Sequence, residues 1–370
     1  MIEWSPTTIK AFQTTLLTWY DTAGRDLPWR RDQEPYHVWV SEIMLQQTQV
    51  QTVIPYYERF MAWFPTVTAL AEAPEERLLK AWEGLGYYSR VRNMQRCARQ
   101  LLADYEGQWP QTAAALTELI GIGPYTAGAI ASIAFNEPVP AVDGNAYRVF
   151  SRLLEIDADI TKPGTRQLFE RVISRIMPHD RPGDFNQAIM DLGASYMTAR
   201  QPDTEHSPVK VFNQAYLDGK ELDYPVRTKK PRPQPIDYVA VVTKMGPDWL
   251  MTQRGSQGML ANLWTVPLIK LADLDLPTET VPSAELVTAV IAYFKREYQL
   301  TLTAEPLAVR PVTHTFTHQK WTIQLLSGQV APADLAFFAG KSVNEEALSQ
   351  LPMPKVQTKI WDRYHSAEAK

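Results

Sequence analysis

The segment LTELIGIGPYTAGAIASIAF, residues 116–135, decides the fold expected for the first half of this chain. It predicts a helical run, a turn at Gly121-Ile122-Gly123, and a second helix that starts at Pro124 and continues through small residues. Two glycines let a backbone approach a phosphate, and the helix N-terminus directs free N–H groups at it. The pattern predicts a helix-hairpin-helix whose phosphate contact reads no base sequence. The alternative is an ordinary glycine turn between two core helices.

Around this segment the chain divides into regions of different periodicity. At 370 residues it exceeds the usual size of one hydrophobic core, so we expect two domains. Apolar residues recur at three- and four-residue spacing up to residue 216, which predicts an all-α domain over 1–216. Residues 217–236 are rich in proline and basic residues and predict an exposed linker. Short β-rich runs and an amphipathic helix follow, so we expect an α+β domain over 237–370.

Composition excludes several classes of protein. Hydrophobic residues make up 45% of the chain and charged residues 21%, which excludes disorder and fibrous repeats. No apolar run reaches the roughly 18 residues of a membrane span, and the first residues lack a signal-peptide pattern, so we expect a cytoplasmic protein. The only cysteine, Cys97, excludes internal disulfides, a thiolate-ligated iron–sulfur cluster and a cysteine-rich zinc site.

The net charge of −4 argues against a dominant electrostatic attraction to nucleic acid. A local basic face nevertheless survives in residues 90–99, which hold four arginines. These arginines either contact DNA or form a solvated helix face, and the sequence leaves both possibilities open. They are Arg90, Arg92, Arg96 and Arg99.

Two acidic residues occur in settings suited to catalysis. Asp143 starts the helical run DGNAYRVFSRL, where it is either a helix N-cap or a carboxylate that stabilises a positively charged sugar. Glu42 lies among apolar residues in YHVWVSEIMLQQTQV, where it either faces water or is buried. Burial would raise its pKa and make it a proton donor near neutral pH. Two carboxylates in unequal environments would then divide the work of cleaving a glycosidic bond.

Six segments occur in order in the helical half: GRDLPWR (24–30), SEIMLQQTQV (41–50), GLGYYSRVRN (84–93), GIGPYTAGAI (121–130), VDGNAYRV (142–149) and FNQAIMDLGA (185–194). Together they resemble the adenine DNA glycosylases of the MutY type, within the endonuclease III superfamily. The resemblance implies an all-α glycosylase domain with a helix-hairpin-helix, followed by an α+β Nudix-like (MutT-like) domain. The implied reaction is hydrolysis of the N-glycosidic bond of adenine mispaired with 8-oxoguanine, which leaves an abasic site in DNA undergoing base excision repair.

The resemblance also implies roles for single residues. Glu42 matches the acid that protonates N7 of the extruded adenine, and Asp143 matches the carboxylate that stabilises the oxocarbenium-like sugar. Tyr125 takes the place of a tyrosine near the reacting centre, and Asn145 that of a residue orienting the acid and water. The implied adenine pocket consists of Arg25, Trp29, Arg30 and Gln187. The implied contacts with DNA or the lesion are Gln47, Thr48, Leu85, Tyr87, Gly121, Gly123, His314, Phe316, Thr317 and His318.

The second domain is expected to recognise 8-oxoguanine through residues 314–318. Thr317 replaces the family's usual serine and keeps a hydroxyl group that can hydrogen-bond the lesion. The alternative for His314 and His318 is a surface hairpin or a metal pair, and the alternative for Tyr87 is a core aromatic. Phosphohydrolase activity is not expected, because Glu285 and Glu297 alone cannot supply the Mg²⁺ ligands of a Nudix box.

Most members of the resembled family bind a [4Fe–4S] cluster through four cysteines that follow the DLGA segment. In this chain the corresponding positions carry no thiolate, so we expect a cluster-free subset, without cofactor or metal. Packing around Phe212 and Tyr216 is expected to stabilise this segment in place of the iron–sulfur cluster. The corresponding positions are Met197, Thr204, Ser207 and Asn213.

Two other functions stay open at this stage, an endonuclease III-like glycosylase for damaged pyrimidines and a lesion-binding protein without turnover. Related lyases carry a catalytic lysine at the position of Tyr125, so we expect a monofunctional glycosylase that does not nick the strand. The expected partner is double-stranded DNA with an A:8-oxoguanine mispair. We expect a monomer with no membrane partner, and the sequence identifies no protein partner.

Overall fold

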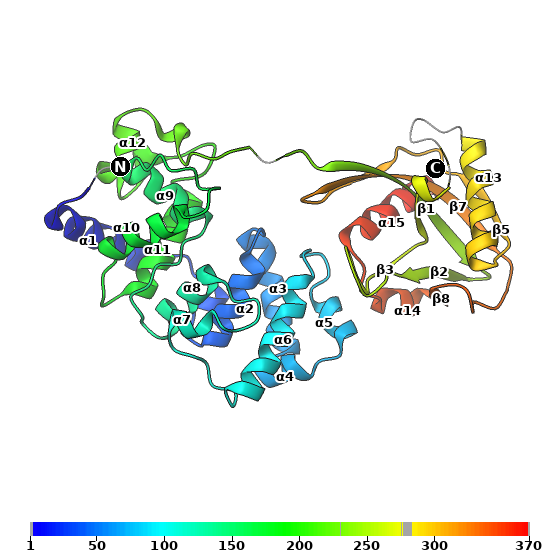
Figure 1. Ribbon diagram of the computed structural model, residues 1–370, viewed down its shortest axis with the longest axis horizontal. Helices are drawn as coiled ribbons and strands as arrows, with labels where there is room; N and C mark the ends of the chain where they lie inside the picture. The colour runs from blue at the N-terminus through cyan, green and yellow to red at the C-terminus, as the bar shows by residue number, and fades with distance from the viewer. Residues whose placement is uncertain (1–2, 230, 275, 277–282, 369–370) are drawn as a thin grey trace. The chain divides into compact units, whose positions relative to one another are not determined.

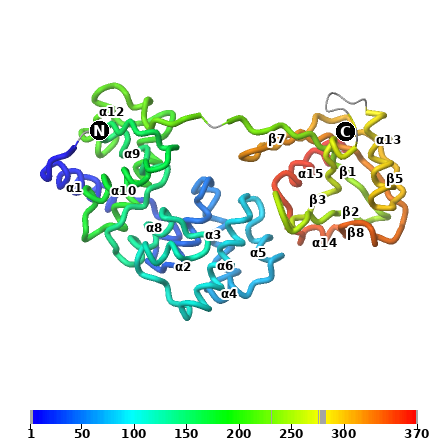
Figure 2. Tube along the Cα trace, in the orientation of Figure 1, coloured from blue at the N-terminus to red at the C-terminus, as the bar shows by residue number. Residues whose placement is uncertain are grey.

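The computed structural model describes residues 3–229, 231–274, 276 and 283–368, which form two compact units (Figures 1 and 2). The first unit comprises Met1–Ala73 and Ser89–Lys229, and the second comprises Pro74–Tyr88 and Lys230–Lys370. The first unit is helical and the second is α+β, as the two periodicities predict. None of the described helices is long and apolar enough to cross a membrane.

The helical unit surrounds a core in which helices from its two ends meet. Phe12 of the N-terminal helix, Phe150 and Phe185 are each 0% exposed and lie in one apolar cluster. Val149, Phe150 and Leu153 follow the three- and four-residue spacing that places them on one helix face. The helices are α1 Pro6–Ala23, α2 Pro35–Leu45, α3 Val50–Trp63, α4 Val67–Glu72, α6 Ser89–Asp104, α7 Ala113–Leu116, α8 Pro124–Ala134, α9 Gly144–Leu154, α10 Thr165–Ile176, α11 Pro182–Ser195 and α12 Gln214–Leu217.

The hairpin at 116–135 is present, with a shorter first helix than the sequence predicts. α7 ends at Leu116, and turns with i→i+3 hydrogen bonds replace the expected helical run over 117–120. Thr117 causes part of this change, because its hydroxyl donates to the Ala114 carbonyl at 2.6 Å. Gly121 has φ +79°, and a Cβ there would lie 2.8 Å from Asn93 Cβ, so the turn requires glycine.

The α+β unit is built on one mixed sheet. β1 and β7 run parallel at its centre and pair from Gln234–Gln319 to Met245–Val330, while the other pairings are antiparallel. The order is β3-β2-β1-β7-β5, with β4 on β1, β6 on β7 and β8 on β2. The strands are β1 Gln234–Met245, β2 Asp248–Gln253, β3 Trp264–Thr265, β4 Leu268–Lys270, β5 Leu302–Pro306, β6 Val312–Thr315, β7 Gln319–Val330 and β8 Gly340–Val343.

Alternate residues of β1 divide this unit into two cores, as a strand buried on both faces requires. Tyr238, Ala240 and Val242 join the core under α15, whereas Val239 and Val241 join the core under α13. α14 covers the same face of the sheet as α15, and a π-helical turn extends α13. The bounds are α13 Ser283–Tyr293, π-turn Phe294–Tyr298, α14 Glu345–Gln350 and α15 Lys355–Glu368.

The segment Pro74–Tyr88 packs in the second unit, although its sequence lies in the helical half. It contains α5 Glu75–Ala81 and a glycine-rich turn. Lys80 Nζ donates to the Leu351 carbonyl at 3.2 Å, and Tyr88 Oη donates to the Met353 carbonyl at 3.2 Å. The segment therefore interrupts the first unit in the sequence.

Candidate active site

One cavity in the helical unit gathers most of the residues that the sequence singled out as catalytic or pocket-forming. It has a volume of about 840 Å³ and is reached by α2, by the N-termini of α8 and α9, and by α11. Its lining includes both candidate carboxylates, so the sequence segments 41–50 and 142–149 meet at one site. The expected residues that line it are Arg25, Trp29, Arg30, Glu42, Gln47, Thr48, Tyr125, Asp143, Asn145 and Gln187.

Glu42 is buried in this cavity, with 4% of its surface exposed, which excludes the alternative of a helix-edge residue facing water. Burial raises the pKa of its carboxyl group to about 7. The hydrogen bond from Tyr125 Oη to Glu42 Oε2 opposes this rise, the charge of Asp143 adds to it, and the charge of Arg30 opposes it. Glu42 is therefore close to half protonated at neutral pH.

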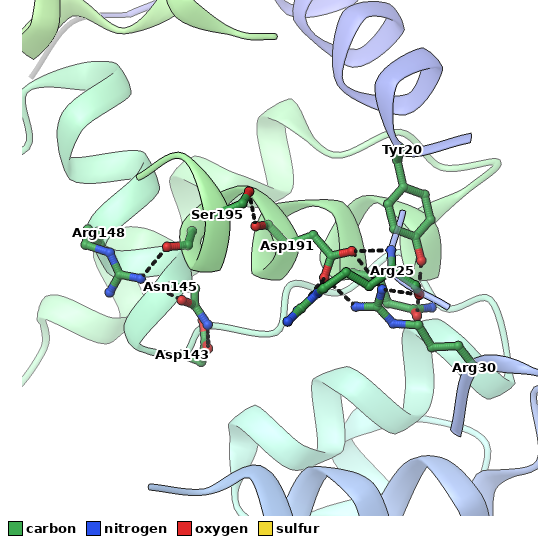
Figure 3. A network of polar contacts seen from close by, with 10 residues as sticks. Tyr20, Arg25, Arg30, Asp143, Asn145, Arg148, Asp191 and Ser195 are labelled. Carbon is green, nitrogen blue, oxygen red and sulfur yellow. Dashed lines mark hydrogen bonds and ion pairs between the residues drawn. The ribbon is translucent and has the colours of Figure 1, made fainter. Parts of the chain in front are cut away.

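Asp143 is held at the N-terminus of α9, where it is also the N-cap (Figure 3). Its Oδ1 accepts the Ala146 N–H at 2.7 Å, and its Oδ2 accepts from Asn145 Nδ2 at 2.7 Å. Burial raises the pKa of this carboxyl group, while these hydrogen bonds and the charge of Arg148 oppose the rise. Arg148 also donates to Asn145 Oδ1 at 2.7 Å and to the Met197 carbonyl at 2.5 Å. The N-cap prediction is thus correct and leaves the carboxylate facing the cavity.

Asp191 is a residue of this site that the sequence analysis missed (Figure 3). It is 2% exposed and accepts from Arg25 Nε at 2.7 Å and from both terminal nitrogens of Arg30 at 2.8 Å. Burial favours the neutral form of Asp191, but the hydrogen bonds and charges of the two arginines prevail and lower its pKa. Its signal in the sequence was available, because Asp191 is an acid in an apolar helix, four residues after Gln187 and hence on the same face.

Tyr20 is the second residue that the sequence analysis missed (Figure 3). Its hydroxyl donates to Gln187 Oε1 at 3.2 Å, and its ring lies 5.7 Å below the Arg30 guanidinium. Burial raises the pKa of Tyr20, so it stays a neutral donor. A tyrosine in the first helix carries no local signal, since its partners lie far away in the sequence.

Gln47 and Tyr87, both expected to approach the base stack, have left-handed backbones with φ of +62° and +48°. Such conformations are costly for side chains of these types and gather at functional sites. Tyr87 is 47% exposed, which excludes the core-aromatic alternative, whereas Leu85 is buried. Gln47 lines the cavity of the first unit, and Tyr87 belongs to the second unit.

Residues 314–318 comprise the end of β6 and the loop 316–318, which joins β6 to β7 in the second unit. Phe316 packs against His314 and Trp321, with ring centroids 4.5 and 4.7 Å away, and so anchors the loop. Thr317 and His318 are exposed, and Thr317 Oγ1 lies 2.6 Å from Tyr87 Oη. The described residues include no group of three or more side chains able to hold a metal ion, so His314 and His318 gain no third ligand.

Two of the four clustered arginines support the helical unit. Arg90 donates to the Ile43 and Gln46 carbonyls at 2.6 and 2.7 Å, which closes the C-terminus of α2 behind Glu42. Arg99 donates to the Ala71 carbonyl at 2.9 Å. These contacts favour a structural role for half of the basic run.

The positions that would carry cluster ligands are buried and engaged in other contacts. Met197 lies in the apolar core, and Asn213 Nδ2 donates to Glu221 Oε1 at 2.8 Å. The Thr204 hydroxyl donates to the same carboxylate oxygen. The rings of Phe212 and Phe12 pack with their centroids 5.5 Å apart. A donor set without thiolate does not fit an iron–sulfur cluster.

Comparisons with known proteins agree with this geometry. Residues 40–175 match the family model described as HhH-GPD superfamily base excision DNA repair protein, and residues 238–363 match the NUDIX domain model. The adenine DNA glycosylase of Rattus norvegicus is 36% identical over 373 residues, which cover 86% of this chain and 70% of that protein. That of Mus musculus is 34% identical over 416 residues, covering 96% and 78%. That of Arabidopsis thaliana is 34% identical over 403 residues, covering 93% of this chain and 63% of that protein, less than two thirds of its length.

Solved structures resemble the helical part. A thermostable thymine-DNA glycosylase gives a TM-score of 0.51 at 26% identity, covering 57% of this chain and 98% of that one. A non-covalent endonuclease III–DNA complex gives a TM-score of 0.51 at 20% identity, covering 59% and 99%, and shows the fold alone.

A helix-hairpin-helix with two carboxylates in one cavity, followed by an α+β domain of Nudix type, defines a base excision DNA repair protein of the HhH-GPD superfamily. The expected fold class is therefore confirmed. Within that superfamily the chain belongs to the adenine DNA glycosylases, as its relatives in rat and mouse show.

Replacing Asp191 tests whether it neutralises the two arginines. We expect Asp191→Asn to lower the free energy of unfolding by about 3 kcal/mol, because it leaves two partly buried guanidinium groups without a counter-charge. Asp184→Asn in the same helix is the matched control, since Asp184 pairs with Arg181 at the surface and its loss should cost less than about 1 kcal/mol. Urea denaturation measures both, and equal losses would contradict the role given to Asp191.

Proposed function

We propose that this protein hydrolyses the N-glycosidic bond of adenine mispaired with 8-oxoguanine in duplex DNA and leaves an abasic site. The observation that carries the proposal is that Glu42 and Asp143 line one cavity in unequal environments. Carboxyl groups whose environments differ are suited to separate acid and stabilising roles in glycoside cleavage. Membership of the adenine DNA glycosylases supports adenine as the base.

Glu42 is the proposed general acid. Tyr125 occupies Oε2, while none of the described residues hydrogen-bonds Oε1, so this oxygen can present a proton to N7 of an extruded adenine. Protonation weakens the bond from the base to the sugar because the leaving group becomes neutral. A pKa of about 7 keeps enough of the acid form at neutral pH and still permits proton transfer.

Asp143 is the proposed partner of the sugar. Hydrogen bonds from Ala146 and Asn145 fix both of its oxygens, so the carboxylate is oriented before the substrate arrives. As the bond to adenine breaks, positive charge develops on the sugar, and a fixed carboxylate stabilises it. Water then adds to the sugar carbon and gives its proton to the Glu42 carboxylate left by the first step, which yields the abasic product and restores the acid.

The remaining pocket residues are proposed to recognise the base. Trp29 is buried and supplies an apolar wall, and Arg25, Arg30 and Gln187 supply polar groups around it. Because Asp191 holds both guanidinium groups and Tyr20 holds the Gln187 amide, these groups are positioned without the substrate. An extruded base offsets its lost stacking in such a pocket.

Recognition of the opposite base is proposed for the second unit and for Gln47 and Thr48. Thr317 and His318 are exposed at the tip of the loop, and the exposed Tyr87 ring can stack on a base. The helix-hairpin-helix, with Gly123 at the open N-terminus of α8, is proposed to bind phosphate.

The endonuclease III-like alternative requires an amine nucleophile for lyase chemistry, and Tyr125 stands at that position. The non-catalytic alternative leaves the burial of Glu42 beside Asp143 without a role. We therefore propose a monofunctional glycosylase that acts as a monomer. We also propose that it belongs to a cluster-free subset of the family, on the donor set described above, and that it works in the cytoplasm.

Replacing either carboxylate should abolish most turnover. On a duplex with adenine opposite 8-oxoguanine, Glu42→Gln and Asp143→Asn should each lower the single-turnover rate of adenine release on the order of 10²-fold or more. Glu72→Gln, which changes an exposed carboxylate at the end of α4, is the control and should keep the wild-type rate. Wild-type product should break only after alkali. Release by Glu42→Gln at the wild-type rate would refute the acid role, and breaks without alkali would refute the monofunctional reaction.

The pH dependence should report the Glu42 proton. The general acid acts in its protonated form, so the single-turnover rate should fall as pH rises through about 7. Glu42→Gln should keep its slow rate across this pH range and should not show the fall in rate above about pH 7. A wild-type rate that stays constant across that range, measured with saturating enzyme, would show that no group with this pKa donates the proton.

Iron analysis tests the cluster-free assignment. Protein purified without oxygen should contain no stoichiometric iron and should release adenine at the same rate after treatment with a chelator. The reason is that the four positions lack thiolates and all make other described contacts. An iron content equal to one cluster per chain would contradict the assignment.

A further inference from the structure

A polar groove on the α+β unit takes no part in the reaction described above. It has a volume of about 800 Å³ and lies between residues 308–313 and helix α15. β6 borders it before running into the loop at 316–318. The polar side chains that line it are Arg310, Thr313, Lys359, Asp362, Arg363 and Ser366.

The groove is strongly basic. Lys355, Lys359 and Arg363 follow one another at four-residue spacing, which places them in a row on one face of α15. Arg310 faces the same groove, where Asp362 is the only acid in the lining. Like charges at this spacing destabilise a helix, so the row carries a cost that a bound anion would offset.

The described residues leave most of these cations without a counter-charge. No acidic side chain among the described residues forms an ion pair with Arg310, Lys355, Lys359 or Arg363. Lys359 Nζ donates a hydrogen bond to the Thr313 carbonyl at 3.1 Å. The positive charge of the groove also acts on His314 next to it. Burial and the charges of Lys359 and Lys355 lower the pKa of His314 to about 4. Its Nδ1 atom is buried and has no hydrogen-bond partner.

We propose that this groove binds backbone phosphates of the DNA strand that carries 8-oxoguanine, an inference that rests on the function proposed above. Its place relative to the loop supports this occupant. Thr313 in the groove and Thr317 in the loop are four residues apart, at most about 13 Å in an extended chain. That distance corresponds to about four nucleotides along the axis of one strand. The groove therefore lies within reach of a strand that is presented to the loop.

The chemistry of the lining suits phosphodiesters. Arg310 and Arg363 can each bind two phosphate oxygens through paired N–H groups, and Lys359 adds a point charge. The hydroxyl group of Thr313 is a further donor. Such contacts position a duplex without reading its bases, which suits an enzyme whose net charge of −4 gives no general attraction to DNA.

The test compares two double variants of the full chain. Arg310→Gln/Arg363→Gln should lower the slope of log binding constant against log salt by about 1.8, because two phosphate contacts are lost. Each single variant should lower it by about 0.9. Lys295→Gln/Arg296→Gln is the matched control. It also removes two positive charges, but these follow Phe294 in the core on the α13 face of the sheet, which is the face opposite to α15. The probe is an 8-oxoguanine duplex with a cleavage-resistant 2′-fluorinated adenosine.

A second measurement locates the contact. Neutral methylphosphonate links are placed one at a time within four nucleotides of 8-oxoguanine, on either strand. On the lesion strand they should weaken wild-type binding several-fold and change binding by the groove variant little. Equal salt slopes for wild type and groove variant, or equal sensitivity to the neutral links, would overturn the proposal and would leave an acidic protein segment as the occupant.

The two proposals fail separately. Adenine release by the wild type together with unchanged slopes in the groove variant refutes the groove alone. Binding of the lesion duplex without adenine release by the wild type refutes the proposed reaction. Thermal unfolding of each variant checks that both arginines are dispensable for folding, and the single variants give the answer if the double variant unfolds.

Discussion

The chemistry proposed for this protein depends on the burial of one carboxyl group, that of Glu42. α2 is apolar on nearly every side, so it is enclosed by neighbouring helices and carries Glu42 inside with it. Besides the phosphate binding proposed for it, the hairpin has a structural task, because α8 starts at Pro124 and brings the Tyr125 hydroxyl to the Glu42 carboxyl group. The N-terminus of α9 brings Asp143 to the same cavity. Three helix positions thus define one reacting site.

The pKa of Glu42 is set by burial, hydrogen bonding and neighbouring charges, which act in opposite directions. Burial and the charge of Asp143 favour the neutral acid, whereas the Tyr125 hydrogen bond and the charge of Arg30 favour the carboxylate. Asp191 enters this balance through Arg30, whose charge it neutralises with two hydrogen bonds. If the guanidinium groups bind the base and the neutral acid is catalytic, as proposed, the pocket also needs a buried counter-charge. This explains why an acid unrelated to the reacting bond lies so deep in the site.

The sequence predicts the fold class, and the reasons for its misses are physical. Glycine, proline and periodicity locate the hairpin and the change from a helical to an α+β region, because these signals are local. Glu42 and Asp143, the two candidate carboxylates, line one cavity. Whether Glu42 is buried could not be decided, since its cover comes from helices far along the chain. Tyr20 was missed for the same reason, because its partners Gln187 and Arg30 lie far away in the sequence. Asp191 was overlooked although it gives a local signal, four residues after Gln187 in an apolar helix. The packing of Pro74–Tyr88 with the second unit likewise depends on contacts with residues such as Leu351 and Met353.

Direct titration of Glu42 tests the central claim most directly. Carbon-13 NMR of protein labelled at glutamate side-chain carboxyl carbons, with Glu42→Gln used to assign the signal, follows this one group without substrate. The structure predicts a midpoint at about pH 7, well above the ordinary range for glutamate. A midpoint near the ordinary value of about 4.3 would show that the cavity does not keep the acid protonated. The proton donor would then have to be sought elsewhere.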